Sequence, residues 1–175
     1  MTVVLFLLIV VPMLIEARRA AANERAQRSH GGIQPPGDIA VYRWMQLAYP
    51  GAFIAMLFEG ALRVGPSQPW LLAGLICYVV SKAVKWWAIL TLGPFWTFRV
   101  VVIPNATLVA RGPYRFLRHP NYVAVVGELV SVALMTGAAV SGPLAVVLFG
   151  MLISQRISVE DEALASSARH PPCSL

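Results

Sequence analysis

The sequence predicts an all-α, polytopic membrane protein with about five transmembrane helices. Of its 175 residues, 58% are hydrophobic and only 13% are charged, and the mean hydropathy is +0.68. Soluble domains carry about a quarter charged residues, so this composition is typical of a chain embedded in lipid. The length is that of one domain, and we expect residues 1–175 to form a single unit.

Five apolar segments are each long enough to form a span, or most of one, at about 20 residues per bilayer crossing. They cover residues 2–15, 41–62, 70–91, 121–140 and 142–155. The first segment has no basic region before it and no small-residue cleavage site after it. We therefore interpret it as a retained span rather than a signal peptide.

The polar connections differ in charge. Residues 16–38 carry four arginines, and residues 92–120 carry four more. The connections "RVGPSQP" and "TGAAVSGP" carry one arginine between them. Because cytoplasmic loops are rich in Lys and Arg, the two arginine-rich connections are predicted to be cytoplasmic, with the N-terminus outside and the C-terminus inside.

This topology also explains the net charge of +6. The fourteen Lys and Arg residues fall mostly in two clusters between apolar segments. Nucleic-acid binding would place them along a groove with interleaved aromatic residues, so no nucleic-acid partner is predicted. The two cysteines, Cys77 and Cys173, are too few for a disulfide framework or a metal site, and no metal is predicted.

Most basic residues near the membrane have a simple interpretation. Four arginines after the first apolar segment are expected to orient the chain and contact phosphate head groups, namely Arg18, Arg19, Arg25 and Arg28. Lys82 and Lys85 lie near the cytoplasmic end of the third segment beside Trp86 and Trp87. This pattern is typical of snorkelling lysines next to an aromatic belt, so both are predicted to be structural.

Two acidic residues lie inside apolar segments. Glu59 is near the outer end of the second segment, where it could either reach the interface or belong to a site. Glu128 lies about seven residues into the fourth segment. An unpaired charge there costs roughly 2.5 kcal/mol or more, so such a residue faces a cavity or a partner. Glu128 is therefore a candidate site residue.

A third acidic feature is the stretch "RISVEDEAL". Arg156, Glu160 and Leu164 recur every four residues and share one helical face, with Asp161 beside them. A solvated, self-paired helix end and a binding site both fit this pattern.

The loop "RGPYRFLRHPNY" has a distinctive proline pattern. Pro113 and Pro120 restrict the backbone of the residues before them, and Tyr122 opens the next helix. His119 is therefore held at the mouth of the fourth segment. The N–H groups of a helix N-terminus attract anions, so the loop favours a small charged ligand.

At these residues the sequence resembles the integral-membrane methyltransferases of the isoprenylcysteine carboxyl methyltransferase family. The family shares an R-H-P-x-Y loop and, one helical hairpin later, R-x-x-x-E-[ED]-x-x-L. The matching positions are Arg118, His119, Pro120, Asn121 and Tyr122, followed by Arg156, Glu160, Asp161 and Leu164. The resemblance covers about residues 85–165, within which residues 92–165 would form the cofactor-binding and catalytic part.

Within the family, residues 92–128 look most like the bacterial branch that O-methylates phenolic lipids, the alkylpyrones and alkylresorcinols. Glu128 and the "NER" that follows the first segment fit that branch. The resemblance implies a bacterial inner (plasma) membrane location. It also implies a lipophilic acceptor that enters from the bilayer and is either a phenolic or pyrone lipid or a prenylcysteine-like carboxylate.

The resemblance implies S-adenosylmethionine as methyl donor and S-adenosylhomocysteine as product, bound in a cytosolic loop region over the last two helices. Glu160 and Asp161 would bind the ammonium or ribose hydroxyls, His119 and Tyr122 the carboxylate and adenine ends, and Arg156 would hold the acids. The implied cofactor-binding residues are Arg118, His119, Pro120, Tyr122, Arg156, Glu160 and Asp161.

The acceptor side follows from the chemistry of methyl transfer. A phenol or enol must lose a proton, and Glu128 or His119 is the candidate catalytic base. Trp96 and Arg99 in "FWTFR" would line the acceptor mouth, or else anchor the loop at the interface. Two features depart from the family pattern: the tail "ASSARHPPCSL" lacks an aromatic-rich continuation, and Asp161 stands where glutamate is common.

Two other functions compete with this one. Membrane sterol and steroid reductases share a loop resembling R-H-P-N-Y and use NADPH. A non-enzymatic membrane scaffold is the second alternative, and it predicts that neither cofactor binds. The short chain and the R-x-x-x-E-D-x-x-L stretch favour the methyltransferase.

Overall fold

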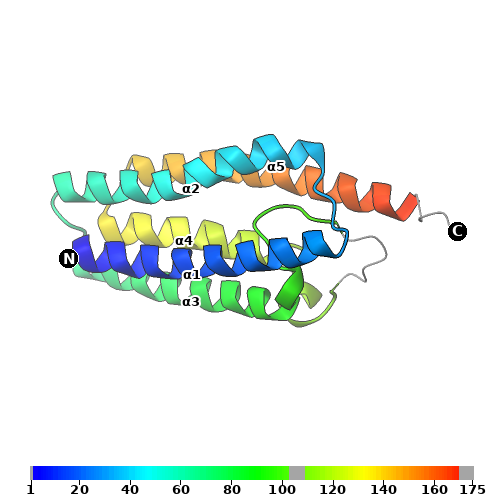
Figure 1. Cartoon of the computed structure of the whole chain (residues 1–175). Helices are drawn as coiled ribbons and strands as arrows, with labels where there is room; N and C mark the ends of the chain where they lie inside the picture. Colours follow the sequence, from blue (N-terminus) through cyan, green and yellow to red (C-terminus); the bar gives the residue numbers. More distant parts are fainter. Residues whose placement is uncertain (1, 103–108, 170–175) are drawn as a thin grey trace, which may run out of the picture.

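A computed structural model describes residues 2–102 and 109–169, and these fold into a bundle of five helices (Figure 1). The helices are α1 (Thr2–Ser29), α2 (Pro36–Leu62), α3 (Gln68–Leu92), α4 (Pro120–Thr136) and α5 (Ser141–Arg169). Two short 3-10 turns, η1 (Gly93–Phe95) and η2 (Gly112–Arg115), lie in the connection between α3 and α4. The described residues contain no strand beyond one isolated bridge between Ile33 and Val102, which confirms the all-α class.

Each predicted apolar segment corresponds to one helix. Three helices in the described part are long and apolar enough to cross a membrane: Pro36–Leu62, Gln68–Phe95 and Ser141–Ala163. The apolar helix α4 is shorter, with 17 residues, and α1 is apolar only over its first half. Helix α5 continues well past the predicted boundary at residue 155, because the following residues are mostly helix formers such as Glu, Ala and Leu.

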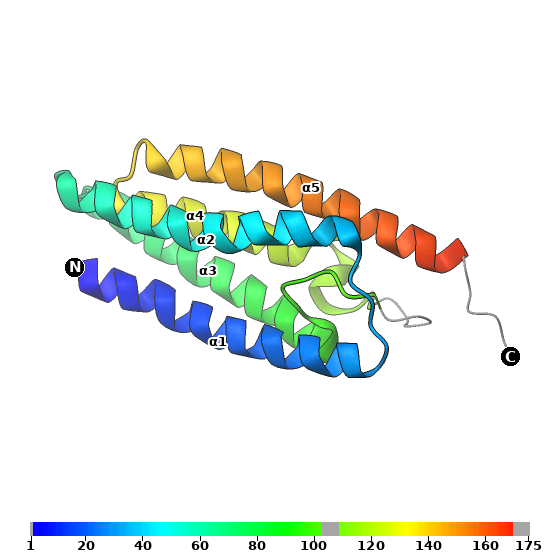
Figure 2. The same cartoon turned by 45° about the horizontal axis from the view of Figure 1, so that its top comes forward.

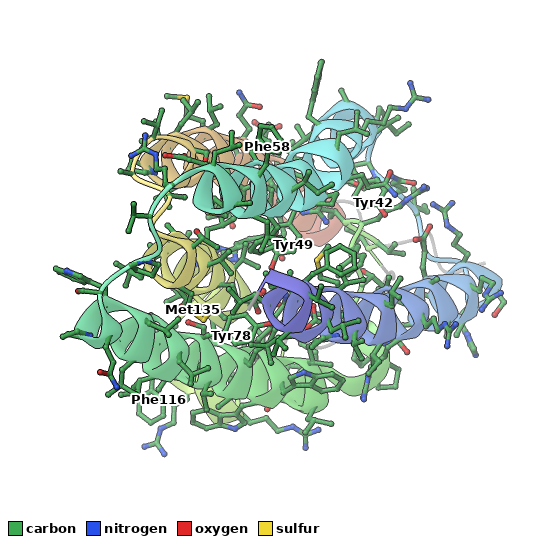
Figure 3. All side chains as sticks on the ribbon, turned by 90° about the vertical axis from the view of Figure 1, so that its left-hand side faces the viewer. Tyr42, Tyr49, Phe58, Tyr78, Phe116 and Met135 are labelled. Carbon is green, nitrogen blue, oxygen red and sulfur yellow. The ribbon has the colours of Figure 1, made fainter. Side chains whose placement is uncertain are left out.

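Helix α4 lies at the centre of the bundle, with α3 on one side and α2 and α5 on the other (Figure 1). Its residues Leu129, Val132 and Met135 are fully buried and pack with Met56 of α2. Figure 3 shows Tyr49 and Tyr78 in the interior of the bundle, whereas Phe58 and Phe116 are exposed. Exposed apolar side chains cover the outside of the helices, as expected for a surface that faces lipid.

Small residues bring α3 and α4 close together. A Cβ atom added at Gly74 would lie 2.8 Å from the carbonyl oxygen of Ser131, and one added at Gly127 would lie 2.3 Å from the Oγ of Ser81. Membrane helices associate through such positions because lipid offers no hydrophobic drive for their packing. This close pair fixes the position of α4, which carries three of the candidate site residues, Pro120, Tyr122 and Glu128.

The connections gather at the two ends of the bundle (Figure 1). Residues 30–35 and the described parts of 93–119 lie at one end, and residues 63–67 and 137–140 lie at the other. The four arginines expected in the first connection belong to the second half of α1, next to residues 30–35. This is the alternation that the arginine distribution predicts. Which end faces the cytoplasm stays a prediction.

Glu59 has a structural role at the other end of the bundle. Its carboxylate accepts hydrogen bonds from the backbone N–H groups of Val140 (3.1 Å) and Ser141 (2.7 Å), and from the Ser141 hydroxyl (2.6 Å). It also forms an ion pair with Arg63 at 3.0 Å. Glu59 thus caps the N-terminus of α5 and ties it to the end of α2, which decides between the two interpretations left open by the sequence.

Helix α1 lies to one side of the bundle and stands apart from α2 at its N-terminal end (Figure 2). Leu5 and Ile9 pack into the core, and Ala20 packs with Ile89 and Trp96 further along the helix. Asn23 donates hydrogen bonds to the carbonyls of Gly93 (2.9 Å) and Trp96 (2.8 Å). These bonds attach α1 to the connection that follows α3.

Candidate functional site

The two sequence motifs meet at the end of the bundle that holds the arginine-rich connections. Arg118 forms an ion pair with Asp161 at 3.0 Å, and the Tyr122 hydroxyl donates to a Glu160 carboxylate oxygen at 3.3 Å. Helix α4 begins at Pro120. Proline has no N–H group, but the N–H groups of the first turn have no partner within a helix, so no helical hydrogen bond is lost. The fold therefore brings the start of α4 against the C-terminal half of α5, as the resemblance implies.

Arg156 contacts different partners from those expected. Its guanidinium forms a buried ion pair with Asp38 at 2.7 Å, donates to the carbonyl of Phe98, and donates to the Tyr122 hydroxyl at 3.0 Å. The structure shows no direct contact between Arg156 and Glu160 within the described residues; Tyr122 stands between them. Arg156 thus reaches Glu160 only through Tyr122, and its own ion pair is with Asp38 of α2; its role in holding the acids stays a prediction.

Sequence reasoning missed Asp38, which is fully buried in the first turn of α2. Besides Arg156, it accepts hydrogen bonds from Gln34 at 2.8 Å and from the backbone N–H of Val100 at 3.2 Å. The signal was available, since an acidic residue after "PP" at a helix start is favoured there. Asp38 thus joins α2, α5 and the connection after α3 around one carboxylate.

His119 immediately precedes α4, and its ring stacks on Tyr122 with centroids 5.4 Å apart. Its Nε2 atom is buried and, among the described residues, has no hydrogen-bond partner. The side-chain oxygen of Asn121 is in the same situation. Buried polar atoms are nearly always paired in folded proteins, so two such neighbours at one helix start are suited to a polar ligand.

Tyr114 of η2 completes this end of the bundle. Burial, together with the charge of Glu160, raises the pKa of Tyr114 above its ordinary value. Its hydroxyl therefore stays protonated at neutral pH and is a hydrogen-bond donor. We call Asp38, Tyr114, Arg118, His119, Tyr122, Arg156, Glu160 and Asp161 the loop-end site.

Trp96 does not line an acceptor mouth. It is 2% exposed and packs with Ala20 of α1 and Ile89 of α3. The expectation is wrong for Trp96 because α1 covers it. Arg99 is about one-third exposed, lies 4.8 Å from the ring centre of Tyr42, and forms a 3.5 Å ion pair with Glu24 of α1.

Glu128 lies in a second group of charges inside the bundle. Lys82 contacts Glu16 at 2.8 Å and Glu128 at 3.1 Å, and Lys85 contacts the same two carboxylates at 2.7 and 3.2 Å. Glu128 also accepts a hydrogen bond from the Tyr49 hydroxyl. We call Glu16, Tyr49, Lys82, Lys85 and Glu128 the buried charge cluster.

This cluster corrects the prediction for the two lysines. Lys82 and Lys85 do not snorkel to the interface; their side chains are only 13% and 3% exposed. Their spacing of three residues on α3 puts them on one face, and that face points inward. Their carboxylate partners come from α1 and α4, at separations of more than forty residues, so no local pattern could have revealed the pairing.

The loop-end site and the buried charge cluster lie at different depths. Tyr122 and Glu128 are six residues apart on α4, which is about 9 Å along a helix. The structure shows no contact between Glu128 and His119 among the described residues. The two candidate bases therefore belong to separate centres. Within residues 2–102 and 109–169, no group of three or more His, Cys, Asp or Glu could hold a metal ion.

The fold and the loop-end site together indicate a class of protein. It is the class of helical membrane proteins that carry a polar site at one end of the bundle. Comparison with known families identifies the class further. The chain belongs to the isoprenylcysteine carboxyl methyltransferase (ICMT) family, whose sequence model matches residues 74–166. The matched region contains most of α3, all of α4 and most of α5, and thus both motifs of the loop-end site.

Two bacterial relatives extend this comparison. The chain is 31% identical to the uncharacterized protein YpbQ of Bacillus subtilis over 162 residues, which cover 91% of this chain and 94% of YpbQ. It is 23% identical to an uncharacterized protein of Haemophilus influenzae over 93 residues, 53% of this chain and 54% of the relative. No solved structure matches the chain. Family membership places the protein among membrane methyltransferases.

Proposed function

We propose that this protein transfers the methyl group of S-adenosylmethionine to an oxygen of a lipophilic acceptor in the bilayer. The observation that carries the proposal is the hydrogen-bonded junction of the two motifs, in which Tyr122 connects Arg156 to Glu160 and Arg118 pairs with Asp161. The resemblance of residues 92–128 to the phenolic-lipid branch favours a phenolic or pyrone lipid as the acceptor. A prenylcysteine-like carboxylate is the alternative.

The residues of the loop-end site fit the polar groups of the donor. Among the described residues, Arg118 donates to Asp161 and Tyr122 donates to Glu160. A carboxylate can accept several hydrogen bonds, so both acids can also bind the ammonium group or ribose hydroxyls. Arg118, 79% exposed, and the N-terminus of α4 suit the donor's carboxylate. The unpartnered Nε2 of His119 suits a polar atom of the nucleoside.

When bound, S-adenosylmethionine supplies an activated methyl group, so the protein itself needs no nucleophile. Its residues must orient the two reactants and exclude water. Arg156, held between Asp38 and the Phe98 carbonyl, fixes the Tyr122 hydroxyl and through it Glu160. Pro120 starts α4 at the position that sets His119 and Tyr122 side by side.

The acceptor's proton needs a base, and two residues are proposed for this role. His119 lies at the loop-end site and has a buried ring nitrogen free to accept a proton from a ligand, as judged from the described residues. Glu128 lies deeper, where the acceptor's head group would arrive from the bilayer. Arg99, which is about one-third exposed, remains the proposed contact for the acceptor near the surface.

Binding of the two candidate cofactors distinguishes the proposed function from its alternatives. Purified protein in nanodiscs is titrated with S-adenosylhomocysteine and with NADPH while the melting temperature is followed. We expect only S-adenosylhomocysteine to raise it. A rise with NADPH alone would indicate a reductase, and no rise with either would indicate a scaffold.

The reaction itself is tested with radiolabelled S-adenosylmethionine and a long-chain alkylphenol in the same nanodiscs. We expect label in the lipid fraction, and none when the phenol is replaced by its O-methyl ether. The proposed setting is the bacterial inner membrane with the loop-end site in the cytoplasm, where S-adenosylmethionine is available.

A further inference from the structure

The buried charge cluster is a closed arrangement of alternating charges. Each lysine bridges both carboxylates, with four nitrogen–oxygen distances between 2.7 and 3.2 Å. Glu16 and Glu128 are each 1% exposed, and Lys82 at 13% is the member nearest the surface. The loop-end site, which is proposed to bind the donor, uses none of these contacts. The proposed function uses only Glu128, as a candidate base for the acceptor.

Charge balance in the cluster depends on Glu16. Without it, two ammonium groups would face the single carboxylate of Glu128, and one positive charge would be left unpaired in a poorly solvated interior. An unpaired buried charge is strongly unfavourable, so another monoanion would bind readily in its place. Glu16 comes from α1, the helix that lies to one side of the bundle (Figure 2).

An apolar groove lies further along the same two helices, α1 and α2. It has a volume of about 410 Å³ and lies between the N-terminal part of α1 and the C-terminal half of α2. Its lining residues are Val3, Phe6, Ile54, Leu57, Phe58 and Ala61. Helix α2 also supplies Tyr49 to the cluster. Tyr49 lies about 8 Å along this helix from Ile54 of the groove. Helix α1 supplies Glu16, about 15 Å along the helix from Phe6.

We propose that Lys82 and Lys85 form a binding site for the anionic head of an amphiphile whose alkyl tail lies in the α1–α2 groove. In the present structure Glu16 occupies the place of that head. This inference deepens the proposed function and rests on it for the identity of the amphiphile as the methyl acceptor. The acceptor is then an acidic lipid with one ionised oxygen, such as a phenolate, an enolate or a carboxylate.

Methyl transfer would change the charge that the site recognises. The acceptor oxygen forms the new bond to the methyl carbon with its own electron pair, and the broken carbon–sulfur bond leaves its pair on the donor's sulfur. The oxygen is neutral afterwards and loses its attraction to Lys82 and Lys85. Glu16 can then return, which releases the product into the bilayer.

The test measures amphiphile binding without any methyl donor, so its failure is distinct from failure of the proposed function. Native mass spectrometry of detergent-solubilised protein would quantify bound hexadecanesulfonate, which is ionised at every working pH, and hexadecanol, its neutral match. We expect Glu16→Gln to increase hexadecanesulfonate affinity about tenfold, because the competing carboxylate is gone. Lys85→Met should reduce it about tenfold, and hexadecanol binding should stay unchanged in both.

A second α1 variant separates this effect from general loosening of the helix. Glu24→Gln removes the ion pairs of Glu24 with Arg28 and Arg99 but leaves the cluster intact. It should bind hexadecanesulfonate like the wild type. Equal gains in Glu24→Gln and Glu16→Gln, or parallel gains for hexadecanol, would overturn the proposal. So would a Glu16→Gln variant whose circular dichroism spectrum shows that it is folded, but which binds no more hexadecanesulfonate than the wild type.

Discussion

The buried ion pair between Asp38 and Arg156 is the residue-level contact on which the loop-end site depends. Both side chains are at most 5% exposed. Asp38→Asn would leave the guanidinium buried without a charged partner, so we expect the free energy of unfolding to fall by about 3 to 5 kcal/mol. Denaturation of the protein in detergent, followed by circular dichroism, measures this change.

The exposed pair between Arg118 and Asp161 provides the matched control. These side chains are 79% and 41% exposed, so solvent screens their attraction. Asp161→Asn should change the free energy of unfolding by no more than about 1 kcal/mol. If both variants lost the same free energy of unfolding, the buried pair would stabilise the site no more than the exposed pair does.

The two candidate bases are separated by a pair of measurements. His119→Ala should weaken S-adenosylhomocysteine binding about tenfold, the scale of one lost hydrogen bond. Glu128→Gln should leave that affinity unchanged and lower turnover by about 100-fold or more, as for a lost general base. Wild-type turnover in Glu128→Gln would restrict Glu128 to packing and charge balance.

At the level of single residues, the sequence revealed the groups that belong to a motif and missed their partners. Arg118, His119 and Tyr122 could be chosen because proline and arginine mark a rigid polar loop beside an apolar segment. The partners of Asp38 and Glu16 could not be predicted, because each of these acids pairs with a residue more than sixty positions away. Such contacts depend on which helices pack together, and composition does not specify that.

Among the elements, the α3–α4 pair has the closest fit. A methyl group at Gly74 would lie 2.7 Å from Met135 Cγ and 2.8 Å from the Ser131 carbonyl oxygen, which is backbone and cannot rotate away. Gly74→Ala should therefore destabilise the protein by about 1 to 3 kcal/mol, the range for overpacking. Thermal unfolding in detergent provides the readout.

Gly51 of α2 is the matched control for this prediction. Within the described part of the chain, nothing lies within 4 Å of a Cβ added there. Gly51→Ala should raise stability by up to about 1 kcal/mol, because alanine favours the helix. A Gly74→Ala variant as stable as Gly51→Ala would show that α3 and α4 pack less closely than described.

The positions of the helices followed from the apolar segments and their lengths, while the helix ends were less predictable. The sequence indicated a last span ending near residue 155, yet α5 runs to Arg169. Apolar content marks where lipid begins and ends, and a helix can continue into water when its residues favour it. Sequence reasoning thus located the spans and placed Arg156 and Glu160 on one helical face, but it did not predict that this helix continues the last span without a break as far as Arg169.

At the scale of the whole molecule, the arginine distribution predicts which end of the bundle faces the cytoplasm. In a background with Cys77 and Cys173 replaced by serine, a cysteine at Ser29 should resist a membrane-impermeant thiol reagent in intact cells. A cysteine at Ser67, at the opposite end of the bundle, should react. A cysteine at Thr107 should resist the reagent as well; Thr107 lies outside the described residues.

Reaction at Ser29 with protection at Ser67 would invert this topology. It would place the loop-end site outside the cell, away from cytosolic S-adenosylmethionine. Lysis of the cells before labelling controls for accessibility, since both positions should then react.

The central claim is that the loop-end site binds the methyl donor, and calorimetric titration of the protein in nanodiscs with S-adenosylhomocysteine tests it most directly. Wild-type protein should bind. Glu160→Gln should bind more weakly by about 1.5 to 3 kcal/mol, the scale of a lost hydrogen bond to a charged group. Glu16→Gln, in the buried charge cluster, should bind like the wild type. Absence of binding to the wild type, or undiminished binding to a folded Glu160→Gln variant, would contradict the account.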